Sequence, residues 1–199
     1  MAPSAPKKSR ISRQTKETDI TLSLNIDGQG LAEIKTGVPF MDHMLSLFTV
    51  HGFFDLSITA HGDTEIDDHH TVEDIGICLG LAFKEALGDF SGINRYGHCL
   101  LPMDETMAQV AVDFSNRPFL HYDTVLLDQK VGSFDTQLVL EFLRAFSHNG
   151  GMTLHIEVKY GLNTHHIIEA IFKGLGRSLD QASAVNIRTE GPLSSKGSL

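Results

Sequence analysis

The chain has 199 residues, 41% of them hydrophobic and 21% charged, which is an ordinary composition for a soluble globular protein of one domain or two small ones. Its net charge of -9 argues against broad binding to nucleic acid but allows a local basic pocket for an anionic metabolite. No stretch approaches the roughly 18 consecutive apolar residues of a membrane span, and two cysteines without CxxC spacing fit a reducing cytoplasm.

The first half of the chain alternates between two periodicities. Segments in which every second side chain is apolar predict half-buried strands, and segments with apolar side chains three and four apart predict helices. An aspartate can cap the second helix, and a glycine ends it. The expected elements are strands at 20–26 and 31–36, a helix at 40–51, a strand at 54–60, and a helix from Asp67 or Asp68 to Gly88.

The second half repeats the same order, so we interpret the chain as an internal duplication of an α+β unit, strand–strand–helix–strand–helix, with the helices on one face of each sheet. Its expected elements are strands at 108–114 and 119–127, a helix at 135–148, a strand at 152–158 and a last helix capped by Asn163 or Thr164. The corresponding organisation is a disordered extension at 1–10, repeats at 11–90 and 91–187, and a C-terminal tail at 188–199.

Both long helices begin with the motif His-His-x-x-Glu, at residues 69–73 and 165–169. Adjacent helical side chains point about 100° apart, so one ion is poorly placed to take both imidazoles of a pair. The glutamate lies three or four residues after each histidine and is close to both. Each motif can therefore give one ion a His and a Glu and direct the second His elsewhere. Two motifs could cross-supply two metal sites, between the repeats or between subunits.

A single motif of this kind on a surface helix usually consists of solvated polar residues, but two copies at matched positions of a duplicated unit favour metal ligation. His43 in the first helix and Glu141 in the matching helix of the second half place a titratable side chain at corresponding positions. Imidazoles and carboxylates without thiolates suit Mn, Fe, Co, Ni or Zn, and an ion with open positions can act as a Lewis acid.

The segments that surround these motifs resemble the imidazoleglycerol-phosphate dehydratase family of histidine biosynthesis, over nearly the whole chain from about residue 10. They are “TKET” (15–18), “GVPFMDHML” (37–45), “IDDHHTVEDIGICL” (66–79), “GINRYG” (92–97), “PMDET” (102–106), “SNRP” (115–118), “GLNTHHIIEAIFK” (161–173) and “PLSSKG” (192–197). The resemblance implies a duplicated α+β fold in which helices pack between two sheets, as in ribosomal protein S5 domain 2.

The resemblance also implies a cytoplasmic Mn(II)-dependent hydro-lyase with two ions per active site. Its substrate would be imidazole glycerol phosphate, a small phosphate ester, and its product imidazole acetol phosphate, a step of L-histidine biosynthesis. It implies no membrane or nucleic-acid partner. It implies a homo-oligomer of twenty-four subunits built from trimers, with the metal sites at subunit interfaces.

Carried onto this chain, the family's metal ligands are His43, His69, His70, Glu73, His165, His166 and Glu169. Glu141 stands where many members have His; it either binds the ion through oxygen or leaves a position for another residue or water. Glu17 is the implied general base. The implied substrate-binding residues are Glu17, His43, Arg95, Arg117, Lys173, Ser194, Ser195 and Lys196.

Two other readings of the residues stay open. One is a different two-metal enzyme, such as a hydrolase that uses metal-bound hydroxide. Hydrolysis of a phosphate ester would identify such an enzyme. The other is a non-catalytic metal-binding or storage shell protein, which would bind metal without turnover and would have no need of Glu17.

Overall fold

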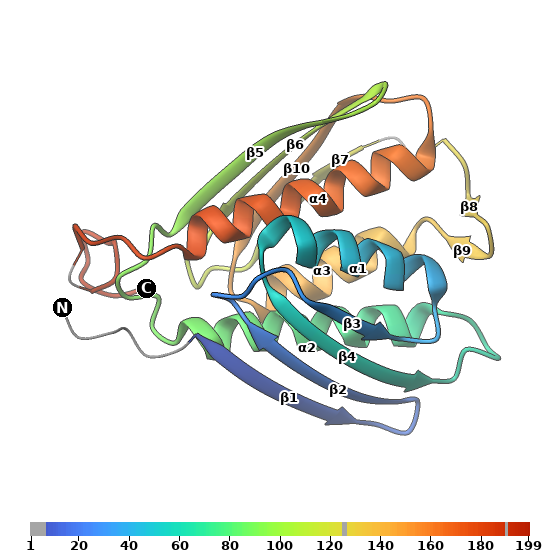
Figure 1. Cartoon of the computed structure of the whole chain (residues 1–199), viewed down its shortest axis with the longest axis horizontal. Coiled ribbons are helices and arrows are strands. Elements are labelled where there is room, and N and C mark those ends of the chain that lie inside the picture. Colours follow the sequence, from blue (N-terminus) through green and yellow to red (C-terminus); the bar gives the residue numbers. More distant parts are fainter. Residues whose placement is uncertain (1–6, 125–126, 190) are drawn as a thin grey trace.

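The computed structural model describes residues 7–124, 127–189 and 191–199, and over these residues two four-stranded sheets enclose four helices (Figure 1). In each sheet three strands are antiparallel, and the last strand is parallel to its neighbour. The strand order of the first sheet is β1 (Lys8–Gln14), β2 (Thr18–Asn25), β4 (Asp55–Gly62), β3 (Ala32–Lys35). The strand order of the second sheet is β5 (Tyr96–Met103), β6 (Thr106–Asp113), β10 (Thr153–Tyr160), β7 (Phe119–Asp123).

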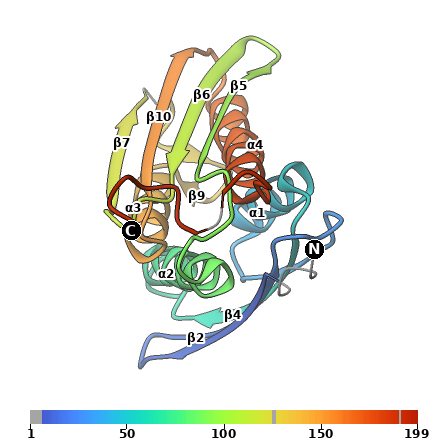
Figure 2. The same cartoon turned by 90° about the vertical axis from the view of Figure 1, so that its left-hand side faces the viewer.

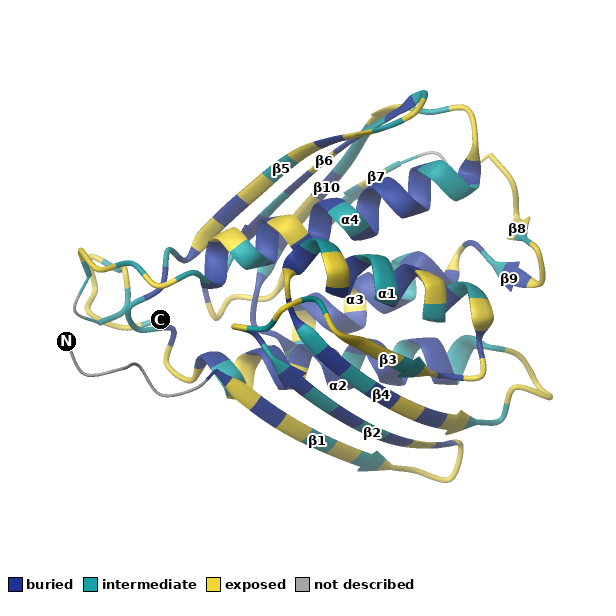
Figure 3. Ribbon diagram, in the orientation of Figure 1, coloured by how far each residue is buried: buried dark blue, intermediate teal, exposed yellow. Residues whose placement is uncertain are grey.

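The helices fill the space between the sheets, so the apolar faces of all layers meet in one core (Figure 3). Helix α2 packs against the first sheet and against α3, while α4 packs against the second sheet and against α1. The bounds are α1 (Pro39–Gly52), α2 (His69–Leu87), α3 (Leu138–Asn149) and α4 (Thr164–Ser183); a short ribbon of β8 (Lys130–Val131) and β9 (Phe134–Asp135) precedes α3.

Glycines allow helices from different repeats to approach closely. A Cβ on Gly80 of α2 would lie 2.6 Å from the carbonyl oxygen of Phe146 in α3, and one on Gly176 of α4 would lie 2.4 Å from that of Phe48 in α1. Phe48, Phe83 and Phe146 then form a buried aromatic cluster that links the repeats, with ring centroids 5.7 to 6.4 Å apart. The two repeats are therefore held together by a shared core.

The expected fold class is confirmed, but each repeat begins with a strand that the sequence pattern did not indicate. Strand β1 runs through Lys8, Arg10 and Arg13, and its edge position explains its charge. Strand β5, also at an edge, contains Gly97 and Pro102, residues that are rare in strands.

The expected disordered extension at 1–10 overlaps β1, so residues 8–10 are ordered strand, and residues 1–6 lie outside the described residues. The strand expected at 119–127 ends at Asp123, with residues 125–126 outside the description. In the part of the chain that the structure describes, no helix has the length and hydropathy to cross a membrane.

Candidate active site

The starts of α1, α2 and α4 lie at one end of the molecule, on the right in Figure 1. Helix α4 begins where predicted: the side chain of Asn163 accepts hydrogen bonds from the backbone N–H groups of His165 and His166. This cap fixes the direction in which the two imidazoles leave the helix. The predicted metal ligands of both motifs are thus at one end of the chain's core.

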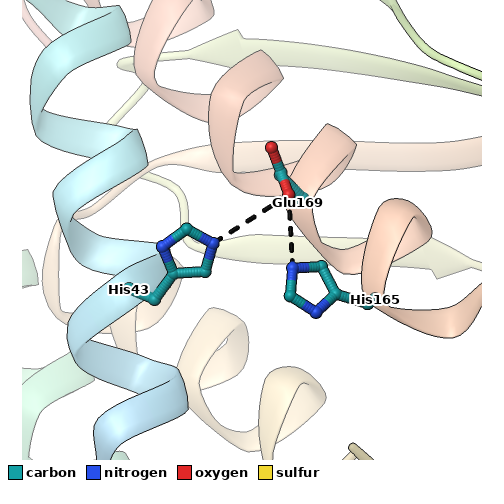
Figure 4. A group of neighbouring side chains, drawn as sticks. All are labelled: His43, His165 and Glu169. Carbon is teal, nitrogen blue, oxygen red and sulfur yellow. Dashed lines mark ion pairs between the residues drawn. The ribbon is translucent and has the colours of Figure 1, made fainter.

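Three predicted ligands converge into one cluster, formed by His43 of α1 and by His165 and Glu169 of α4 (Figure 4). Nε2 of His165 lies 3.3 Å from Oε2 of Glu169, and Nε2 of His43 lies 4.0 Å from the same oxygen. The three donor atoms all lie within 4.8 Å of one another. Two imidazole nitrogens and one carboxylate oxygen at this spacing fit a divalent transition metal ion.

Glu169 is kept ionised inside this cluster although it is only 8% exposed. Burial raises its pKa, but the hydrogen bond and charge of Lys173, with its Nζ 2.5 Å from Oε1, hold the pKa of Glu169 below its ordinary value. A carboxylate rather than a carboxylic acid is the form that binds metal. Lys173 thus lies beside the metal cluster.

The second motif is arranged in the same way but is more open. Nε2 of His69 lies 3.5 Å from Oε2 of Glu73, whose side chain is 45% exposed. The rings of His69 and His70 are 6.1 Å apart at 82°, and those of the second pair are 6.2 Å apart at 82°. The two rings of each pair are therefore nearly perpendicular, and the expectation that they serve different ions stays a prediction.

The second histidine of each pair meets a carboxylate that the sequence analysis did not single out. Nδ1 of His70 lies 3.0 Å from Oδ2 of Asp63, and Nδ1 of His166 lies 2.8 Å from Oε2 of Glu105. These hydrogen bonds raise the pKa of both histidines and lower that of Glu105 to about 2. One indication of these contacts was present in the sequence: Glu105 lies in the “PMDET” segment, and Asp63 lies in the loop before the first motif.

Glu141 does not join a metal cluster among the described residues. Both of its carboxylate oxygens pair with Nη1 of Arg144, at 2.8 and 2.7 Å, one turn along α3. Its role as a ligand therefore stays a prediction. Glu17 lies in the exposed turn between β1 and β2, and its backbone oxygen accepts from the N–H of Asp63.

Three of the four basic residues expected to bind substrate gather at the other end of the molecule, which faces the viewer in Figure 2, whereas Lys173 lies beside Glu169. They line a cavity of about 780 Å³ together with the C-terminal segment. Arg95 is 7% exposed, donates from Nε and Nη2 to Asp113, and donates from Nη1 to the carbonyl oxygen of Leu193. The predicted residues in the cavity lining are Arg95, Arg117, Ser194, Ser195 and Lys196.

Helix α4 extends from the end of the molecule that holds the His43–His165–Glu169 cluster to the end that holds the cavity (Figure 1). His165 is at its start, and the carbonyl oxygen of Ala182 near its end accepts from the backbone N–H of Arg95. At a rise of about 1.5 Å per residue, these two positions of α4 are about 25 Å apart. The His43–His165–Glu169 cluster and the cavity around Arg95 and Arg117 therefore lie too far apart in one chain for one small molecule to contact both.

Residues 36–179 match the family model described as imidazoleglycerol-phosphate dehydratase. Relatives with this name include the protein of Syntrophobacter fumaroxidans, 60% identical over 95% of this chain and 96% of its own, and that of Bacillus licheniformis, 60% identical over 97% of this chain and 100% of its own.

Solved structures agree with these sequence matches. The imidazoleglycerol-phosphate dehydratase of Staphylococcus aureus has a TM-score of 0.82 at 44% identity, covering 90% of this chain and 99% of its own. That of Pyrococcus furiosus, in complex with (S)-C348, has a TM-score of 0.83 at 38% identity, covering 95% and 100%. The chain therefore belongs to the imidazoleglycerol-phosphate dehydratase family, whose members are hydro-lyases of histidine biosynthesis.

Proposed function

We propose that this chain converts imidazole glycerol phosphate into imidazole acetol phosphate at a site that uses two Mn(II) ions and residues of more than one subunit. The dehydratase activity follows from membership of the family. The metal, the roles of single residues and the assembly are our proposal. The observation that carries it is the separation, along α4, of the His43–His165–Glu169 cluster from the cavity around Arg95.

One ion would be held by His43, His165 and Glu169, and the other by His69 and Glu73, with Glu141 as a further candidate. His70 and His166 turn away from the glutamates of their own motifs and would complete the sites of neighbouring subunits. Nitrogen and oxygen donors without thiolates suit Mn(II). When bound, the ions would supply Lewis-acid polarisation of the substrate's imidazole ring, which lets the ring store electrons while hydroxide leaves.

Glu17 would take the proton from the carbon next to the one that loses hydroxide. Its exposed carboxylate has no hydrogen-bond or ion-pair partner among the described residues, and it lies near enough to contribute to the raised pKa of His70. A general base of this kind contributes about 10²–10⁴-fold. The protonated Glu17 can then return its proton as the enol product becomes the ketone.

The cavity would bind the phosphate group. The side chain of Arg117 is 66% exposed, so its guanidinium can turn toward an anion. The guanidinium of Arg95 is instead fixed by Asp113 and holds the C-terminal segment through the carbonyl oxygen of Leu193. An arginine offers a bidentate fork to phosphate, and Lys196 a point charge. Hydroxyl groups of Ser194 and Ser195 supply further donors. Lys173, which contacts Glu169, would reach phosphate from the metal side.

The ring and the phosphate of the substrate are joined by a three-carbon chain, which cannot span about 25 Å of α4. A complete site therefore needs the metal cluster of one subunit and the cavity of another. This requirement supports a homo-oligomer, for which we propose twenty-four subunits built from trimers. We place the enzyme in the cytoplasm, where its two cysteines, both free, would remain reduced.

A dehydratase assay on metal-stripped protein tests the proposal. Addition of Mn(II) should restore ketone formation from imidazole glycerol phosphate, and a simple phosphate ester should not be hydrolysed. Phosphate release without ketone formation would instead indicate a metal hydrolase. Mn(II) binding without turnover of either compound would indicate a metal storage protein, and both results would reject the proposal.

A further inference from the structure

Each repeat contains a carboxylate that contacts the second histidine of its motif from outside the helix. Asp63 directly follows β4 and lies 3.0 and 3.2 Å, through its two oxygens, from Nδ1 of His70. Glu105 lies in the turn before β6 and is 2.8 Å from Nδ1 of His166. Resting on the proposed function, we propose that Asp63 and Glu105 are positioning residues that present Nε2 of His70 and His166 to metal ions of neighbouring subunits.

The physical basis is the tautomer of the ring. A carboxylate is an acceptor, so Nδ1 must carry the proton in the bond from His70 to Asp63 and in the bond from His166 to Glu105. Nε2 of each neutral ring then has a free lone pair, the form that binds metal. The first histidines of the motifs differ, because Nε2 of His69 and Nε2 of His165 face the glutamates of their own helices.

The two repeats reach this arrangement from different positions of the repeated unit. Glu17 and Glu105 are equivalent, since each directly precedes the second strand of its sheet. The position after β10 that matches Asp63 is Gly161, which has no side chain to offer. The hairpin glutamate therefore orients the histidine in the second repeat, and Asp63 takes over that task in the first.

This exchange explains why Glu17 is available for chemistry. If Glu17 were bonded to His70 as Glu105 is to His166, a carboxylate oxygen of Glu17 would accept from the ring N–H and would be less available to take a substrate proton. Asp63 already accepts from Nδ1 of His70, so the Glu17 carboxylate can face the substrate. The duplication thus yields one orienting glutamate and one catalytic base from the same position of the unit.

Glu105→Gln is the sharpest test. Oε1 of Glu105 accepts from the backbone N–H groups of Leu162 and Asn163, at 3.3 and 2.9 Å. The amide oxygen of the variant can keep these bonds, so its NH₂ group faces Nδ1 of His166. That group donates to Nδ1, the ring proton moves to Nε2, and the lone pair for the metal is lost.

The readouts are ring ¹⁵N chemical shifts of the metal-free full-length protein and a calorimetric titration with Mn(II). His166→Gln assigns the ring signal of His166. The wild type should show the Nδ1–H tautomer and Glu105→Gln the Nε2–H tautomer, with an Mn(II) affinity lower by about 10–100-fold. Asp104→Asn removes the same charge from the adjacent residue, whose Oδ2 is 3.9 Å from Nε2, and should leave the tautomer in place.

Asp63→Asn provides an independent variant for the first repeat, with Glu65→Gln in the same loop as its charge control. Because both oxygens of Asp63 lie near Nδ1, the amide can turn its oxygen to His70, and we expect a smaller loss of Mn(II) affinity than in Glu105→Gln. Wild-type tautomer and Mn(II) affinity in both variants would overturn the inference. A wild-type chain that binds Mn(II) but forms no ketone would overturn the proposed function alone, because these readouts use no substrate.

Discussion

The starts of α2 and α4 carry the same motif, yet the glutamate of α4 is more buried and has more neighbouring polar side chains than the glutamate of α2. At α4 the glutamate is buried, is held ionised by Lys173, and meets a histidine from α1. At α2 the side chain of the glutamate is 45% exposed and, among the described residues, pairs with His69 alone. We infer that one metal site is largely preformed in the subunit and that the other gains its remaining ligands on assembly.

Loss of the first histidine of either motif should have the largest effect. His165→Ala removes a donor from the preformed cluster, and His69→Ala removes one from the open site. Because the proposed mechanism requires both ions at the substrate ring, each variant should abolish dehydratase turnover, and His69→Ala should also weaken assembly in size-exclusion chromatography. Unchanged turnover in either variant would contradict the two-ion account.

Glu17→Gln should lower kcat by about 10²–10⁴-fold, because the amide cannot accept a proton from carbon. Mn(II) affinity should stay at the wild-type value, which distinguishes this variant from the histidine variants. The measurement is steady-state turnover with parallel Mn(II) titration. Lys16→Gln in the same turn is the control, since Lys16 is also exposed but cannot act as the base at neutral pH. Full activity of Glu17→Gln would exclude Glu17 as the base.

Arg117→Ala should act on substrate binding at the other end of the molecule. A lost charge-assisted hydrogen bond corresponds to about 1.5–3 kcal/mol, so KM should rise by about 10–100-fold with a smaller change in kcat. Arg144→Ala is a matched control, because Arg144 pairs with Glu141 outside the cavity lining. A change in kcat with constant KM would contradict a phosphate-binding role.

Mn(II) affinity should fall as the pH decreases, because protons compete with the metal for His70 and His166, the second histidines of the two motifs. The hydrogen bonds that His70 donates to Asp63 and His166 donates to Glu105 raise the pKa of both histidines above the ordinary 6.5. Protons therefore compete with metal at a higher pH than at free histidine, and affinity should fall as pH decreases through these raised values. Calorimetric titration between about pH 8 and about pH 6 measures this effect. A constant affinity over that range would contradict it.

The smallest effect concerns the shared core of the two repeats. Gly176→Ala places a Cβ 2.4 Å from a backbone oxygen of α1, which should destabilise the fold by about 1–3 kcal/mol. Gly174→Ala in the same helix meets a side-chain methyl of Val110 at 3.0 Å and should cost less. Thermal unfolding of both variants measures the difference. Equal stability of the two variants would contradict this prediction, because it would show that α1 can shift away from Gly176 of α4 without a cost in stability.

The sequence predicted both motif helices from their periodicity, and it predicted the Asn163 cap of α4 because local hydrogen bonds determine it, whereas Asp68 at the start of α2 makes no side-chain capping bond. It missed β1 and β5, whose edge positions make an apolar alternation unnecessary. It also missed the contact of Glu105 with His166, which joins residues 61 positions apart and depends on how a hairpin lies beside a helix. The placement of Lys173 on Glu169, away from the other cations, likewise required the structure.

Our central claim is that each active site combines the metal cluster of one subunit with the phosphate cavity of another. It is tested most directly by co-expressing His165→Ala with the Arg117→Ala/Lys196→Ala double variant under two tags and purifying the oligomers that carry both. Each variant alone should be inactive or nearly so. The mixed oligomers should regain dehydratase activity, since some interfaces pair an intact cluster with an intact cavity. Mixed oligomers no more active than their parents would contradict the claim.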